Sequence, residues 1–246
     1  MRSAMRMVHV LLRFVATRQG ILQACSAVLV LLLMRLAQTN SAGQLLTSLV
    51  TDGQIHDQLL FIDLVMGVLP YGLFVLIFNF QMFHGKTLIL QRMTSYVWWQ
   101  FCLMTAVLIS ALGFWLLVFG STVGAAELQS HFSAQVPSHG AATAACALLI
   151  HVESTLILIC LLNALIAFGT SQIAAVTCVL SVVGIAVVAN AIQIPVVGLL
   201  VPGPIVTHGS LSVVFLLKST VVSCVKILVL LGLSCWYFYL GKEKMV

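Results

Sequence analysis

Charged side chains are scarce in this chain. They make up only 7% of its 246 residues, whereas an ordinary soluble domain carries about 25%. Hydrophobic residues reach 61%, and the mean hydropathy is +1.16. So much apolar surface cannot all fold inward, so a large part of it must face hydrocarbon. The composition therefore excludes a soluble domain and predicts an integral membrane protein.

Paired cysteines are also missing. The chain has seven cysteines, an odd number, and no two of them are spaced as CxxC. This pattern argues against a disulfide framework and against a zinc site, and it favours small packing residues inside apolar blocks. The seven are Cys25, Cys102, Cys146, Cys160, Cys178, Cys224 and Cys235.

Catalytic and nucleotide-binding motifs are lacking as well. The run His84 to Thr87 resembles the end of a phosphate-binding loop, but Phe80 stands where that loop needs a glycine. His151 and Glu153 are two residues apart, so they point to different sides of a helix and cannot share a metal. No HExxH, GxSxG or Ser-His-Asp pattern is present. We therefore expect no catalytic residues, metal ligands or cofactor in this chain.

Long apolar blocks are what the chain does contain. Each is close to the ~20 residues that a helix needs to cross a bilayer, and the alternation typical of a membrane β-barrel is absent. The sequence predicts one all-α transmembrane domain over residues 1–246 with about six spans. We place them at 20–37, 59–80, 98–120, 143–167, 171–192 and 219–240.

The positive charges predict the orientation. They precede the first span, lie between the second and third, and follow the last, whereas the opposite loops hold no Lys or Arg. Cytoplasmic loops carry the excess of Lys and Arg, so both termini should face the cytoplasm in a multi-pass protein of the cell membrane. The charges are Arg2, Arg6, Arg13, Arg18, Lys86, Arg92, Lys242 and Lys244.

Residues 1–19 mix four arginines with apolar residues and suggest an amphipathic helix at the membrane interface. A disordered basic leader is the alternative. A signal peptide is disfavoured because the next apolar run ends in Arg35 rather than at a cleavage site, and more spans follow.

Residues 193–218 are apolar but rich in proline and glycine. Proline breaks a straight helix, and freed backbone groups are tolerated at membrane depth only beside protein or water. We expect a pair of outer re-entrant helices that forms a gate. The alternatives are a plain external loop and a seventh span. A seventh span would place the C-terminus outside, and the basic Lys242 and Lys244 argue against that. The gate residues are Pro195, Pro202, Gly203 and Pro204.

Four ionisable residues fall within or beside the predicted spans: Asp63, Glu153, Lys218 and Lys226. Such residues are costly in a membrane unless they are paired or hydrated. Helical rise places Glu153 and Lys226 at similar depth, and it places Asp63 within reach of Lys218 or of the outer water. They are interpreted either as the lining of a translocation path or as ion pairs that fix helix register.

The segment 81–97 joins two spans on the predicted cytoplasmic side. It combines the apolar Leu88 and Leu90 with the basic Lys86 and Arg92, a pattern that suggests a short helix docking into a groove on a partner. A simple loop with a belt of aromatic residues is the alternative.

These features together resemble the permeases of type 2 ABC exporters. The likeness covers nearly the whole chain, and its most specific element is His84-Gly85-Lys86-Thr87-Leu88 followed by Gln91-Arg92-Met93-Thr94-Ser95. The chain differs from the family pattern just before that glycine, where it has Gln81, Met82, Phe83 and His84.

The resemblance implies a permease that moves a hydrophobic or amphipathic substrate, with a peptide favoured. ATP and magnesium would be bound by a separate ABC ATPase subunit. That subunit would dock at His84, Gly85, Lys86, Thr87, Leu88, Leu90 and Arg92. A second permease copy or a homologous permease and the lipid bilayer are the other expected partners, and no nucleic acid is expected. A membrane enzyme or an assembly factor without transport activity is the alternative, and an ion-driven carrier is disfavoured because inverted repeats are not recognisable.

Overall fold

The computed structural model describes residues 2–15, 18–50, 96–130, 141–168, 172–191 and 213–243. This part of the chain contains seven helices and no strand, which confirms the all-α prediction within it. The helices are α1 (Arg2–Val15), α2 (Arg18–Gln38), α3 (Ala42–Val50), α7 (Tyr96–Ser130), α8 (Ala141–Ala167), α9 (Gln172–Ala191) and α10 (Val213–Glu243).

Three helices in the described part are long and apolar enough to cross a membrane. The stretches concerned are Gly20–Ala37 in α2, Val97–Gln129 in α7 and Leu148–Ile166 in α8. Two shorter apolar stretches follow, Ile173–Ile185 in α9 and Thr220–Trp236 in α10. The chain is therefore a membrane-embedded, multi-pass protein. The span predicted at 59–80 lies outside the described residues.

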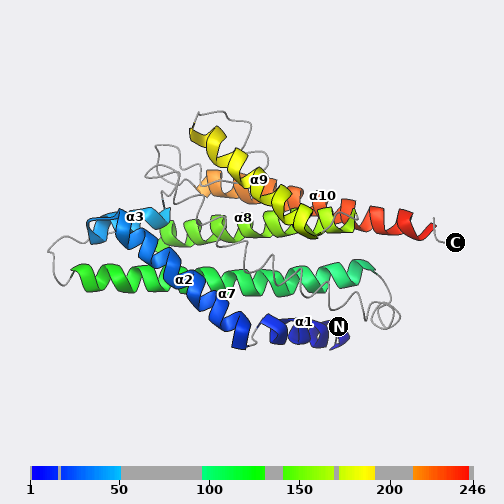
Figure 1. Cartoon of the computed structure of the whole chain (residues 1–246), viewed down its shortest axis with the longest axis horizontal. Coiled ribbons are helices and arrows are strands. Elements are labelled where there is room, and N and C mark those ends of the chain that lie inside the picture. Colours follow the sequence, from blue (N-terminus) through cyan, green and yellow to red (C-terminus); the bar gives the residue numbers. More distant parts are fainter. Residues whose placement is uncertain are drawn as a thin grey trace.

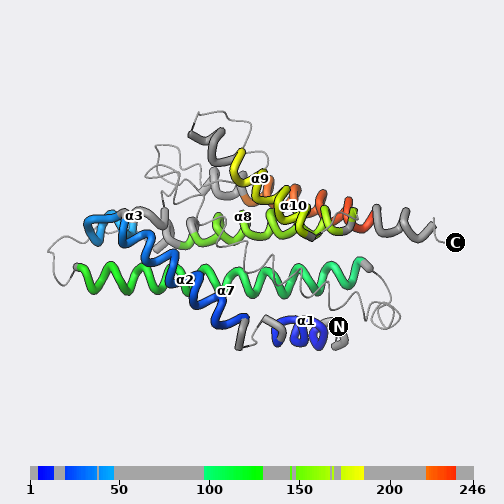
Figure 2. Tube along the Cα trace, viewed as in Figure 1, coloured from blue at the N-terminus to red at the C-terminus, as the bar shows by residue number. Residues whose placement is uncertain are grey.

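The helices form an elongated bundle (Figure 1). α7 and α8 lie side by side and run in opposite directions, while α10 packs along α8 and runs in the same direction as α8 (Figures 1 and 2). α2 crosses α7 obliquely, and α9 turns back from the end of α8. The start of α1 and the end of α10 lie toward the same end of the long axis (Figure 1).

Two helix boundaries differ from the sequence prediction. α7 extends to Ser130, well beyond the predicted end at residue 120. The extension contains small polar residues, but the hydroxyls of Ser121 and Thr122 donate to the carbonyl of Val118 at 2.9 and 2.8 Å, so the helix accommodates them. α10 begins at Val213, so the last residues of the predicted outer segment 193–218 are helical. The rest of that segment, 193–212, is not among the described residues.

The largest buried cluster joins three helices. Phe114, Trp115 and Phe119 of α7 pack with Ala27 and Leu31 of α2, and with residues of α8 on the other side. A second cluster, around Leu158 and Val179, joins α8 to α9. Apolar contacts of this kind place α8 between α7 and α9.

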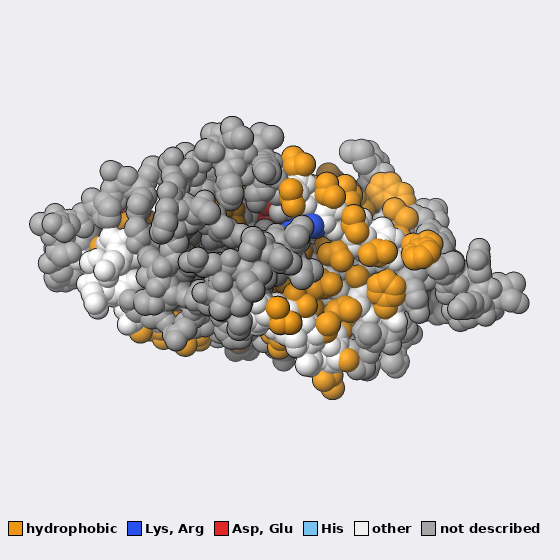
Figure 3. Space-filling model, turned by 90° about the horizontal axis from the view of Figure 1, so that it is seen from above, with side chains coloured by type: hydrophobic (Ala, Val, Ile, Leu, Met, Phe, Trp, Pro, Cys, Tyr) orange, Lys and Arg blue, Asp and Glu red, His pale blue; other side chains and the backbone are white. Residues whose placement is uncertain are grey.

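The outer faces of the bundle are strongly apolar. α10 alone exposes seven large apolar side chains, and the face in Figure 3 is mostly hydrophobic over the described residues. Exposed apolar area on this scale requires hydrocarbon around it. The seven are Val221, Val222, Val225, Leu228, Val229, Leu233 and Trp236.

Candidate functional site

The polar groups of the bundle gather on α8, which contacts α3, α7, α9 and α10. One set of its polar side chains faces α7 and another faces α10. Polar groups inside a membrane bundle are expensive unless they serve packing or function, so α8 is the place to look for a site.

The interface of α7 and α8 holds an aromatic and polar cluster. The rings of Trp115 and His151 stack with centroids 4.4 Å apart and an interplanar angle of 24°, and Phe119 meets His151 edge-on at 5.8 Å. Trp115 Nε1 donates a hydrogen bond of 2.9 Å to Thr155 Oγ1, which itself donates to the His151 carbonyl at 2.9 Å. All four side chains are buried. The indole therefore has the partner that a buried N–H needs.

Further along the same interface the polar contacts continue. Asn163 Nδ2 donates to Gln100 Oε1 at 2.8 Å, and both side chains are buried. Cys160 Sγ lies 3.4 Å from Met104 Sδ. These contacts and the Trp115 cluster follow the antiparallel register of the two helices, so they fix how α7 and α8 align.

Glu153 lies on the α10 side of α8. It shares a helix face with the buried residues Ile157 and Ala164, at spacings of four and eleven residues. The faces toward α7 and α9 are occupied by other residues of α8, and α10 packs on the side that remains. Glu153 is half-buried, and its buried Oε2 has no hydrogen-bond partner among the described residues.

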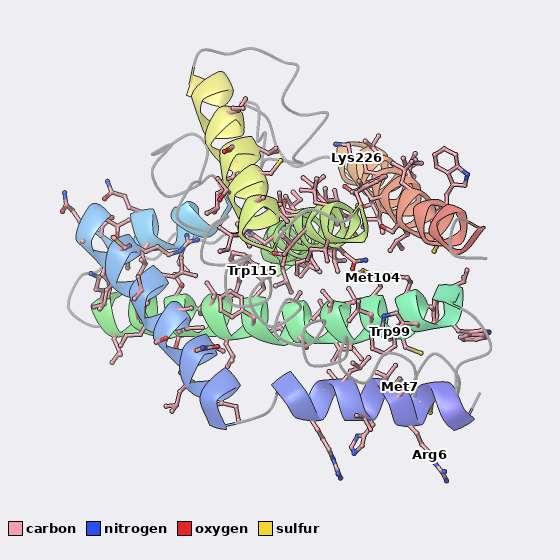
Figure 4. All side chains as sticks on the ribbon, turned by 45° about the vertical axis from the view of Figure 1, so that its right-hand side comes forward. Arg6, Met7, Trp99, Met104, Trp115 and Lys226 are labelled. Carbon is pink, nitrogen blue, oxygen red and sulfur yellow. The ribbon has the colours of Figure 1, made fainter. Side chains whose placement is uncertain are left out.

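The facing side of α10 is also polar. Ser223 and Ser234 are buried, and Lys226 is half-buried between them. Ser234 Oγ donates to the Leu230 carbonyl at 2.9 Å, whereas Ser223 Oγ has no hydrogen-bond partner in the part of the chain that the structure describes. We call Glu153, Ser223 and Lys226 the α8–α10 seam. Lys226 lies on the opposite side of α8 from Trp115 and Met104 (Figure 4).

The structure places the other predicted site residues as follows. Glu153 and Lys226 lie on adjacent helices, but Glu153 Oε2 accepts no hydrogen bond, so their ion pair stays a prediction. Lys218 belongs to the first turns of α10. Asp63, the docking residues between His84 and Arg92, and the gate residues between Pro195 and Pro204 lie outside the described residues.

Several interior polar residues were missed by the sequence reasoning. Arg35 is fully buried at the end of the apolar stretch of α2, and its carbonyl accepts a 2.7 Å hydrogen bond from Thr39 Oγ1. The buried pair of Gln100 and Asn163 was also overlooked. The signal was available, because each is a polar residue within an apolar run, but only Asp63, Glu153, Lys218 and Lys226 were considered.

No protein-family model, curated protein or solved structure matches this chain. The described residues contain no group of three or more His, Cys, Asp or Glu side chains that could hold a metal ion. What the α8–α10 seam offers chemically is a buried carboxylate oxygen and a buried hydroxyl that have unused hydrogen-bonding capacity. Such groups can receive a polar or charged group inside an apolar bundle.

Proposed function

We propose that this chain is the membrane permease subunit of an ATP-binding-cassette exporter. It moves a hydrophobic or amphipathic substrate, with a peptide favoured, across the cytoplasmic membrane. A separate ATPase subunit binds ATP and magnesium and supplies the energy.

One observation carries the transport part of this proposal. A bundle with an apolar exterior buries Glu153 Oε2 and Ser223 Oγ at the α8–α10 seam, and neither atom has a hydrogen-bond partner among the described residues. An unsatisfied buried polar group costs about 1–3 kcal/mol, and two such atoms fall at this seam, while Gln129 Oε1 is another one elsewhere. A path that opens to water or substrate gives these atoms their partners during the transport cycle.

The direction of the helices also supports the six-span arrangement. α2 ends and α7 begins at opposite ends of the long axis, which fits one crossing between them, and the termini share one end (Figure 1). The resemblance of residues His84 to Ser95 to the exporter family supports the ATPase as the partner. It also supports a second permease copy or a homologous permease, since these transporters work as dimers.

A co-purification experiment tests this function. The chain is expressed in its native host, isolated in mild detergent, and probed for a bound ABC ATPase. The double variant Leu88→Asp/Leu90→Asp should lose the ATPase, because two carboxylates cannot enter an apolar groove. The matched control Phe132→Asp/Val136→Asp adds the same charge to the predicted external loop and should keep it.

Normal ATPase binding by the Leu88→Asp/Leu90→Asp variant would remove the docking assignment. A purified chain that carries a covalent lipid intermediate and no ATPase would favour the membrane enzyme instead. The gate is tested separately: single cysteines at Pro195, Pro202 and Pro204 should react with membrane-impermeant reagents from outside only, and labelling from the cytoplasm would establish an extra crossing.

A further inference from the structure

The basic face of α1 is the strongest feature that the proposed function leaves unused. Arg6, His9 and Arg13 are exposed on this helix, together with the apolar Met5 and Val10. The sequence has no acidic residue before Asp52. This face therefore carries positive charge with no neutralising carboxylate on its own helix.

The other face of α1 is fixed to α7. Leu11 is fully buried against Trp99, Cys102 and Leu103, and further apolar residues of α1 pack around this contact. Figure 4 shows Met7 directed toward α7 near Trp99 and Arg6 directed away from it. α1 lies lengthwise beside the first turns of α7, so its basic face is presented at a defined level of the bundle (Figure 1).

That level can be compared with the thickness of a bilayer. The apolar stretch of α7 has 33 residues, or about 50 Å, whereas the hydrocarbon core is about 30 Å thick. The 18-residue apolar stretch of α2, about 27 Å long, shares a buried cluster with Phe114, Trp115 and Phe119 of α7, and Leu36 near its end packs beside Ala126. One end of the apolar stretch of α7 must therefore extend beyond the hydrocarbon core.

The turns of α7 before Val107 are the ones that α1 covers. They carry Trp98 and Phe101, which are exposed and meet edge-to-face with ring centroids 5.8 Å apart. Exposed tryptophan at the end of a span is typical of the headgroup layer of a membrane. The basic face of α1 lies beside this end of α7.

We propose that α1 and the first turns of α7 form a binding surface for the headgroups of anionic phospholipids. Arg6 and Arg13 bind the phosphates, and Met5 and Val10 contact the upper acyl chains. Arginine suits this role because its planar guanidinium donates paired hydrogen bonds to phosphate. Lipid binding at this surface does not require the chain to be a transporter. The experiment below therefore tests it independently of the proposed function.

Lipid selectivity measured by electron spin resonance tests this surface. The full-length protein is reconstituted in phosphatidylcholine vesicles that contain a trace of spin-labelled phosphatidylglycerol or spin-labelled phosphatidylcholine. Each basic residue near the surface contributes about a fivefold preference for anionic lipid at low salt. The measured preference is an average over all lipids around the protein. We therefore expect the protein-bound lipid to favour phosphatidylglycerol by about two- to fivefold in 20 mM salt. In 0.5 M salt the preference should vanish because the charges are screened.

Variants locate the effect. Arg6→Gln/Arg13→Gln should remove most of the preference at low salt, whereas Arg6→Lys/Arg13→Lys should retain most of it. Lys242→Gln/Lys244→Gln removes the same charge beside the last span and should lower the preference less than Arg6→Gln/Arg13→Gln does. A wild-type protein without preference, or an equal loss of preference in the two glutamine variants, would overturn the proposal. The salt series on the wild-type protein decides the matter even if a variant fails to fold.

Discussion

Trp115 of α7 stacks on His151 of α8, with ring centroids 4.4 Å apart, and its indole nitrogen donates to Thr155 one turn further along α8. One side chain thus makes both an aromatic and a polar contact across the interface of the two helices. Because both contacts are buried, they fix the register in which α7 and α8 pack.

Removing the indole nitrogen should weaken this contact. Trp115→Phe keeps an aromatic ring against His151 but leaves Thr155 without its donor, so we expect a loss of about 0.6–2 kcal/mol in the free energy of unfolding. Thr155→Val should cost a similar amount, and the double variant should cost less than the sum. Denaturant titrations in detergent measure these values, and strictly additive losses would show that the hydrogen bond contributes nothing.

The buried amides of Gln100 and Asn163 provide a second test of the same interface. Gln100→Leu or Asn163→Leu alone removes the hydrogen bond between the two buried amides and should cost about 1–3 kcal/mol. The double leucine variant replaces both partners and should be close to the wild type in thermal stability. A double variant that is less stable than either single variant would contradict the 2.8 Å pairing.

The α1 contact predicts a contrast between two adjacent residues. Leu11 is fully buried against α7, whereas Val10 is 42% exposed. Leu11→Asp places a charge in an apolar contact and should release α1, which limited proteolysis of the N-terminus would detect as faster cleavage. Val10→Asp serves as the comparison and should be cleaved more slowly than Leu11→Asp, because Val10 does not lie in the buried contact with α7. Equal cleavage of the two variants would mean that α1 is not held by Leu11.

Glu153 and Lys226 stand on packed helices, and their ion pair is still a prediction. If they pair, Glu153→Gln and Lys226→Met should each cost about 3–5 kcal/mol, because each leaves a charge buried alone, and the double variant should recover folded yield. Transport that stays lost in the recovered double variant would assign the pair to the path as well. Additive losses of folded yield would show that the two residues do not meet.

Much of the fold follows from the apolar runs of the sequence. The described helices α2, α8 and α9 lie close to the spans predicted at 20–37, 143–167 and 171–192, because ~20 apolar residues without proline leave a membrane helix as the stable solution. The extension of α7 to Ser130 was not predicted. Its serine, threonine and glycine residues look like a loop, but the helix satisfies the hydroxyls itself and packs its end against α3 through Ala126.

The polar interior was predicted only in part. Glu153 and Lys226 stand out because a charge in an apolar run is conspicuous. The partners of Trp115, His151, Gln100 and Asn163 could not be predicted, because a single sequence does not show which helices pack together or in which register. Arg35 was read as the end of an apolar run, although its side chain is completely buried.

The central claim is that the α8–α10 seam lines a transport path, and the reactivity of a cysteine at Ser223 tests it most directly. In a cysteine-free protein assembled with its ATPase, Ser223→Cys should react with a water-soluble methanethiosulfonate reagent when ATP is supplied. Leu228→Cys, which is 68% exposed on the apolar face of α10, should stay unreactive because lipid covers it. A cysteine at Ser223 that remains protected in every nucleotide state would contradict the claim.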